Sequence, residues 1–132
     1  MADTDVTSSN DGTMDPRATK PFGGVDVAAH VILDNTSLIA NTGAGDQLRG
    51  AAGDDLIFGG GGDDLIHGGD DNDGLSGDQG ADLIFGGRGD DILSGGEAND
   101  ILEGGIGADT LRGDNGPDIL TGEAGSDALI GG

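Results

Sequence analysis

Ten aspartates recur at intervals of nine residues in the second part of the chain, and their types and spacing point to metal chemistry. They are Asp46, Asp55, Asp64, Asp73, Asp82, Asp91, Asp100, Asp109, Asp118 and Asp127. A carboxylate is a hard oxygen donor, and neither His nor Cys shares this spacing, so the row favours Ca²⁺ or Mg²⁺ over transition metals. Mg²⁺ requires a small octahedral shell and retains its waters. A larger, flexible cage of carboxylates and turn carbonyls suits Ca²⁺ better.

The aspartates belong to a nine-residue repeat that runs from residue 41 to residue 130 without insertion or deletion. The ten copies read NTGAGDQLR, GAAGDDLIF, GGGGDDLIH, GGDDNDGLS, GDQGADLIF, GGRGDDILS, GGEANDILE, GGIGADTLR, GDNGPDILT and GEAGSDALI. The sixth position is always Asp and the eighth is always Leu or Ile, while the first is Gly in every copy except at Asn41. Two columns without an exception exclude compositional bias and indicate a repeat architecture.

The repeat also predicts the elements that position the aspartates. Glycine supplies positive φ, so the first six residues are expected to form a tight turn. The last three are expected to form a short strand whose middle Leu or Ile points inward. Two such units return the chain over itself, so one coil takes two repeats, and repeats two apart stack in parallel. The sequence therefore predicts an all-β fold, a flattened right-handed parallel β-roll (β-solenoid) with two repeats of nine residues per coil.

The pattern resembles the glycine-rich nonapeptide of the RTX (repeats-in-toxin, hemolysin-type) proteins, G-G-x-G-x-D-x-U-x with U a large aliphatic residue. Three copies match it without a departure: GGGGDDLIH (59–67), GGRGDDILS (86–94) and GGIGADTLR (104–112). The resemblance implies a parallel β-roll of a secreted bacterial protein, with Ca²⁺ held in the turns. It also implies that each ion is shared by turns two repeats apart, through the sixth-position Asp and turn carbonyls.

Applied to this chain, the resemblance implies up to about eight calcium ions. The expected Asp pairs are 46 with 64, 55 with 73, 64 with 82, 73 with 91, 82 with 100, 91 with 109, 100 with 118, and 109 with 127. The expected carbonyl ligands lie around Gly50, Gly59, Gly60, Gly62, Gly68, Gly77, Gly86, Gly87, Gly89, Gly95, Gly104, Gly105, Gly107 and Gly113. The fourth position is not Gly at Ala44, Asp71 and Ala98, where we expect the turn to be strained.

The charge of the chain supports a cation-binding role. The formal net charge is −21, and residues 41–132 hold 20 acidic and three basic side chains. About eight divalent ions would bring this part near neutrality, whereas stacked aspartates without metal would repel strongly. We therefore expect a chain that is disordered without metal and folds in millimolar Ca²⁺. The same charge argues against nucleic-acid partners and anionic membrane surfaces, and no apolar run is long enough to span a bilayer.

A second feature lies at the seventh position of alternate repeats, which share one sheet. There Leu65, Leu83, Ile101 and Ile119 form a row, here called the aliphatic stripe, with Phe85 beside it. The stripe predicts a docking face for a protein partner, a second copy or another part of the parent chain. The alternative is that these residues reflect only β-propensity at exposed strand positions. His67 is interpreted as an exposed spacer.

Six other acids of the repeats occupy variable positions and are interpreted as mostly solvated charge. They are Asp54, Asp63, Asp78, Asp90, Asp114 and Glu123.

The chain divides into residues 1–21, expected to be a disordered polar tail, residues 22–40, a lead-in that caps the roll, and the RTX roll at 41–132. Residues 1–21 lack the basic start and apolar run of a signal peptide. The resemblance to RTX proteins implies secretion by a type I system. Gly131 and Gly132 open an eleventh repeat, which suggests a fragment or a truncated product. The catalytic signatures of metalloproteases, lipases and P-loop enzymes are absent.

The sequence therefore predicts a non-catalytic calcium-binding module of a secreted bacterial protein that folds on Ca²⁺ binding outside the cell. Two alternatives stay open. One is an accessory module that binds a glycan or a protein partner, for which only Arg49, Arg88 and Arg112 supply basic charge along the roll. The other is a fragment of a secreted protease or lipase whose catalytic domain lies elsewhere.

Overall fold

The computed structural model describes residues 5–7, 30–32, 38–40 and 43–132. Most of the predicted polar tail (1–21) and capping segment (22–40) lies outside the described residues. Within the described ranges all regular structure is β, and no helix has the length and apolarity that crossing a membrane would require.

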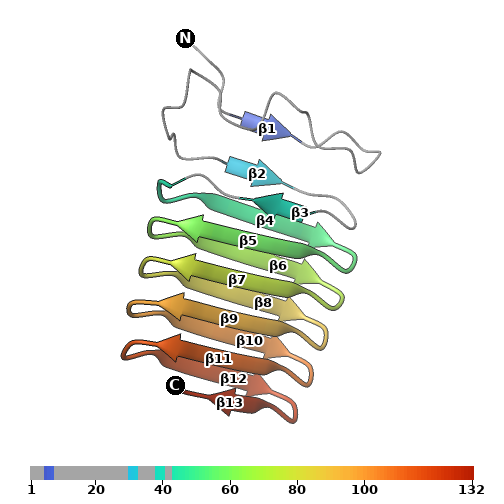
Figure 1. Ribbon diagram of the computed structural model, residues 1–132. Coiled ribbons are helices and arrows are strands. Elements are labelled where there is room, and N and C mark those ends of the chain that lie inside the picture. Colours follow the sequence, from blue (N-terminus) through green and yellow to red (C-terminus); the bar gives the residue numbers. More distant parts are fainter. Residues whose placement is uncertain (1–4, 8–29, 33–37, 41–42) are drawn as a thin grey trace.

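The strands follow one another along the chain as a ladder of short, nearly equal segments (Figure 1). They are β1 (Asp5–Thr7), β2 (His30–Ile32), β3 (Leu38–Ala40), β4 (Gln47–Ala52), β5 (Leu56–Gly61), β6 (Leu65–Asp70), β7 (Gly74–Gln79), β8 (Leu83–Arg88), β9 (Ile92–Glu97), β10 (Ile101–Ile106), β11 (Thr110–Asn115), β12 (Ile119–Ala124) and β13 (Ala128–Ile130).

Consecutive strands alternate between two parallel sheets, so the chain coils as the repeat predicts. Sheet A has the order β1-β2-β4-β6-β8-β10-β12, and sheet B has the order β13-β11-β9-β7-β5-β3. Strands of one sheet pair with a shift of two whole repeats, as in Leu65↔Leu83 and Ile84↔Leu102. Figure 1 shows the coils stacked along one axis, with one sheet in front of the other and tight turns at both edges. The prediction of a parallel β-roll with two nonapeptides per coil is confirmed.

The predicted division of each repeat into six turn residues and three strand residues is wrong. From β4 to β12 each strand has six residues, because it continues through the first three positions of the following repeat. Hydrogen bonds between stacked coils stabilise the Gly-rich segment as strand, although Gly has low strand propensity. Only positions four to six are left to turn the chain.

The core is a single row of Leu and Ile side chains between the sheets. The eighth-position residues from Leu48 to Leu111 are at most 3% exposed, and Leu120 packs partly against them. Leu129 departs from the prediction that every eighth position is buried, since it is 47% exposed. Among the described residues no coil stacks beyond β13, so the side chain of Leu129 lacks the neighbour that covers the other eighth-position residues.

Candidate metal centres

The repeating aspartates lie at the ends of the turns, directly before each strand, and are buried. Eight of them, from Asp46 to Asp109, are at most 3% exposed. Asp118 and Asp127, in the last coils, are partly exposed. A row of carboxylates with so little exposure is unusual, because an ionised carboxylate is costly to bury unless it is paired or coordinates a metal.

All eight expected pairs of aspartates are neighbours in the structure. In each pair the main-chain N–H of the first Asp donates to Oδ1 of the Asp 18 residues later, with N···O distances of 2.7–3.0 Å. In the central coils, Asp73 donates to Asp91 at 2.8 Å and Asp91 donates to Asp109 at 2.9 Å. The column therefore forms two ladders, one along each edge of the roll, here called the inner ladders.

The second carboxylate oxygen has no such partner in most of the column. Oδ2 is buried without a hydrogen bond in seven residues: Asp64, Asp73, Asp82, Asp91, Asp100, Asp109 and Asp118. These oxygens must be protonated or must meet a cation, because a buried acceptor without a partner costs about 1–3 kcal/mol.

The environment of the column disfavours the ionised form in the absence of metal. Burial raises the pKa of Asp64 and Asp73 to about 7. The main-chain hydrogen bond acts in the opposite direction, and the neighbouring carboxylates add to the rise. The same causes raise the pKa of Asp82 and Asp91 to about 6. A nearby divalent cation would reverse this effect, since an opposite charge stabilises the carboxylate.

Oδ2 of the column aspartates points toward the glycine at the first position of the same repeat. A Cβ placed on Gly86 would lie 2.5 Å from Oδ2 of Asp91 and 2.5 Å from the carbonyl oxygen of Gly104 in the next coil. The two oxygens therefore face the same small space, which a side chain would fill. Gly59, Gly68, Gly77 and Gly113 have the same two kinds of neighbour.

Two further carbonyl oxygens lie where the segments 86–91 and 104–109 stack on each other. A Cβ on Gly105 would meet the carbonyl oxygen of Gly87, and one on Gly107 would meet that of Gly89. The segments 86–91 and 104–109, each the end of a strand with the turn that follows it, thus bring three carbonyl oxygens and Oδ2 of Asp91 to their interface. This donor set consists entirely of hard oxygens, as Ca²⁺ prefers.

Side chains alone do not make a metal centre here. Across the part of the chain that the structure describes, no three His, Cys, Asp or Glu side chains converge. Main-chain carbonyls must therefore supply a large share of the ligands. This agrees with the ligand types expected from the sequence, although the coordination itself stays a prediction.

Two of the three turns without Gly at the fourth position, those at Asp71 and Ala98, keep the positive φ of the others, whereas Ala44 does not have positive φ. Asp71 has φ of 79° and Ala98 has φ of 92°, beside φ of 131° at Gly89 and 138° at Gly116. Such values cost a residue with a Cβ about 1–2 kcal/mol. The expected strain is therefore present at Asp71 and Ala98, but it does not break the stacking of the turns.

Asp54, Asp63 and Asp90 are exposed, in agreement with their interpretation as solvated charge, but they also have defined main-chain partners. Each accepts a hydrogen bond from the main-chain N–H 18 residues later: Asn72 at 3.0 Å, Ala81 at 3.0 Å and Ala108 at 2.9 Å. These contacts, with Asp54 and Asp90 on one edge of the roll and Asp63 on the other, are here called the outer ladder. Their donors and acceptors run in the opposite direction to those of the inner ladders. Recurrence of Asp or Asn at the fifth position was the signal that could have identified the outer ladder.

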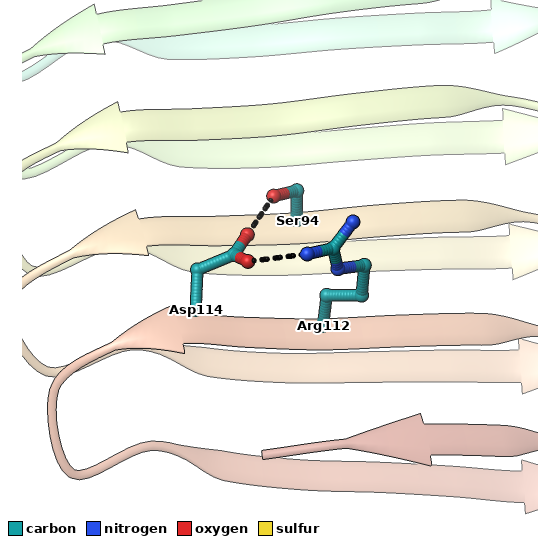
Figure 2. A network of polar contacts seen from close by, with 3 residues as sticks. All are labelled: Ser94, Arg112 and Asp114. Atoms are coloured by element: carbon teal, nitrogen blue, oxygen red, sulfur yellow. Dashed lines mark hydrogen bonds and ion pairs between the residues drawn. The ribbon is translucent and has the colours of Figure 1, made fainter. Parts of the chain in front are cut away.

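Asp114 also has defined partners on the outer face of sheet B. Figure 2 shows its carboxylate between Ser94 of β9, whose hydroxyl donates at 2.6 Å, and Arg112 of β11, whose guanidinium donates at 3.0 Å. Interpreting Asp114 as solvated charge was therefore incorrect.

His67 is another departure from the sequence-based interpretation. It is half-buried and stacks on Phe85, with ring centroids 4.7 Å apart and ring planes 11° from parallel. Burial, followed by the charge of Arg49, lowers the pKa of His67. The two rings meet because their strands, β6 and β8, are neighbours in sheet A.

Comparison with known families agrees with this geometry. The sequence matches the family of the RTX calcium-binding nonapeptide repeat over residues 41–75, 76–111 and 103–132, more than two thirds of the chain. No curated protein and no solved structure matches the chain significantly. The matched ranges contain all ten aspartates of the column and both inner ladders. The chain therefore belongs to the RTX family, and residues 41–132 are an RTX calcium-binding repeat module.

Proposed function

We propose that at neutral pH residues 41–132 fold only when calcium is bound, and that the column aspartates and the turn carbonyls are the ligands. The observation that carries this proposal is the set of seven buried carboxylate oxygens without a hydrogen-bond partner. A roll with this many buried acids needs a compensating positive charge, and the only basic side chains between residues 43 and 132 are Arg49, Arg88 and Arg112, apart from His67.

The chain's own residues would hold each ion between two stacked turns. For the segments 86–91 and 104–109, these residues are Asp91 and Asp109, with the carbonyls of Gly87, Gly89 and Gly104. The bound ion supplies the positive charge that the two turns lack. Because a preformed site does not exist in an unfolded chain, the free energy of binding becomes free energy of folding.

The eight neighbouring pairs of turns set the expected stoichiometry. We propose about eight ions per chain, one for each inner-ladder contact. The two pairs that involve Asp118 and Asp127 are more exposed than the rest. Their ions should therefore bind most weakly, because solvent weakens the attraction.

We also place this module outside the cell and assign it no catalytic role. RTX repeats are typical of bacterial proteins secreted by type I systems, and the family match identifies only a non-catalytic repeat domain. A calcium requirement of about 0.1–1 mM, the range of extracellular modules, would keep the chain unfolded during export and fold it afterwards.

A glycan-binding role finds less support in the arrangement of basic side chains. Arg49 lies on β4 of sheet A and Arg112 lies on β11 of sheet B, so the two do not share a face. Arg88, on β8, is within 4.0 Å of Asp70, which offsets its charge. The described strands therefore offer an acidic glycan no continuous basic surface.

The test is a far-UV circular dichroism titration of the full chain, from excess EDTA into millimolar CaCl₂, with MgCl₂ in parallel. We expect a coil-to-β transition with calcium and none with magnesium at equal concentration. Isothermal titration calorimetry should then give about eight ions per chain. A spectrum that is the same in EDTA and in excess calcium would refute the proposal.

A further inference from the structure

The outer face of sheet A combines an apolar centre with a few charged side chains, of which Arg88 and Asp70 lie within 4.0 Å of each other. In register across β4, β6, β8 and β10, the seventh position presents Gln47, Leu65, Leu83 and Ile101. Ile119 of β12 continues this row, and the structure confirms that the aliphatic stripe is continuous. Ile101 is 44% exposed and Ile119 is 59% exposed, so nothing in the described part of the chain covers them.

The charges on this face follow a pattern that the sequence alone does not reveal. The ninth-position row reads Arg49, His67, Phe85 and Glu103 across the same four strands. The third-position row reads Ala52, Asp70, Arg88 and Ile106. If the order of the strands is reversed, Arg49 and Glu103 exchange places in the ninth-position row. Asp70 and Arg88 exchange places in the third-position row. The other positions of both rows are uncharged, apart from His67.

We propose that sheet A is a self-association surface and that its occupant is a second copy of this chain. The two copies would be related by a two-fold axis that lies parallel to the strands, between β6 and β8. Such an axis preserves the position along the strand and reverses the order of the strands. A C₂ interface of this kind must be self-complementary. The ninth- and third-position rows have this property, and in the seventh-position row Leu65 would face Leu83 while Gln47 would face Ile101.

The axis brings four sets of groups into favourable contact. Arg49 faces Glu103 of the second copy, and Asp70 faces Arg88 of the second copy. Leu65 faces Leu83 across the axis, and the His67–Phe85 stack faces its own copy. Two sheets packed face to face keep their strand directions within about 30°, so these pairs stay close enough to interact.

Sheet B does not have this complementarity. Under the same operation between β7 and β9, Phe58 would face Arg112 and Gln79 would face Glu97, with no pair of opposite charges in register. Its seventh-position row is interrupted by Gly74 and Thr110. The charge pattern therefore selects sheet A.

The size of the face predicts a weak and reversible dimer. Four strands of six residues cover about 20 Å by 19 Å, or about 400 Å² on each copy. The total of about 800 Å² is below that of stable interfaces and falls among transient ones. Dimers should therefore form at high micromolar to millimolar protein concentration.

The first experiment is sedimentation velocity of the full chain in saturating calcium over a range of protein concentration, with circular dichroism on the same samples. We expect a concentration-dependent monomer–dimer equilibrium that Leu83→Asp abolishes. The matched control is Thr110→Asp, which places the same charge at the same repeat position on sheet B and should leave association unchanged. A folded wild-type chain that stays monomeric at millimolar concentration would overturn the proposal, independently of whether calcium drives folding.

The second experiment tests the pairing itself. Arg49→Glu alone would oppose Glu to Glu, and Glu103→Arg alone would oppose Arg to Arg, so each should weaken self-association by about tenfold. Mixed in equal amounts, the two variants would restore both opposite-charge pairs and associate at least as well as wild type. Arg112→Glu, on sheet B, controls for net charge. A mixture that associates no better than the separate variants would refute this arrangement.

Discussion

Replacing Asp91 by Asn should have opposite effects on the metal-free and the calcium-bound roll. Asn keeps the oxygen that accepts from the main-chain N–H of Asp73. Its amide nitrogen replaces the unpartnered Oδ2, which faces the same space as the carbonyl of Gly104. The substitution thus turns a contact between two acceptors into one between a donor and an acceptor, and it removes one charge.

The magnitude in the metal-free state follows from the pKa of Asp91, which burial raises from 3.8 to about 6. At neutral pH this rise corresponds to about 3 kcal/mol. We reduce it to about 1–2 kcal/mol because a buried Asn amide with an N–H left without a partner is itself costly. Asp91→Asn should stabilise the metal-free roll by this amount. In calcium, the same change removes a charged ligand between two pairs of turns and should raise the calcium midpoint about tenfold.

Two circular dichroism titrations measure these effects. Calcium at neutral pH gives the metal-bound midpoint, and trimethylamine N-oxide in EDTA gives the metal-free midpoint, since this osmolyte favours compact states. The matched control is Asp90→Asn, because Asp90 is the exposed neighbour of Asp91 and its oxygen accepts from Ala108. If the two variants have equal calcium midpoints, or if Asp91→Asn does not lower the osmolyte midpoint, the reasoning about buried charge is wrong.

Three further predictions concern glycine, backbone strain and pH. Gly86→Ala, whose Cβ would lie 2.5 Å from two oxygens, should cost about 1–3 kcal/mol in calcium by thermal unfolding. Gly74→Ala, whose nearest contact is the flexible end of Leu56 at 2.9 Å, should cost less than about 0.5 kcal/mol. Ala98→Gly should relieve the strain of a φ of 92° and stabilise the roll by about 0.5–1 kcal/mol, whereas Ala108→Gly should destabilise it. Equal effects within either pair would contradict the geometry. The pKa values of the buried aspartates are raised to about 6 or 7, so the metal-free roll binds more protons than the unfolded chain. That stabilisation is complete below about pH 3.8 and is lost as the pH rises through 6–7, so small-angle scattering in EDTA should show compaction between about pH 8 and about pH 5.

The architecture could be predicted because one period fixes almost everything in a solenoid. Every copy has an Asp at the sixth position, which lies at the turn, and a Leu or Ile at the eighth position, which lies in the core. The coil of two repeats, the two sheets and the register of the aliphatic stripe follow from stacking alternate repeats. The pairs of aspartates follow from the same register.

Other features could not be predicted because they depend on interactions between coils. The strands are longer than expected because neighbouring coils form hydrogen bonds to glycine segments that have little strand propensity of their own. The outer ladder depends on short side chains reaching a main-chain N–H one coil away, as Asp90 does to Ala108. Two features become visible only when rows are compared across the sheet. They are the stack of His67 on Phe85 and the equivalent positions of Arg49 and Glu103 on either side of the proposed two-fold axis.

The constant shift of two repeats between paired strands also constrains how such a protein can change in length. Removing or duplicating one whole coil would preserve the strand pairs and the aspartate contacts, since each remaining turn would still stack on an equivalent turn. Removing a single repeat would transfer all later strands to the opposite sheet, and side chains that faced one side of the molecule would face the other. Gene duplications that lengthen the molecule without rearranging its surfaces must therefore add whole coils, in pairs of repeats.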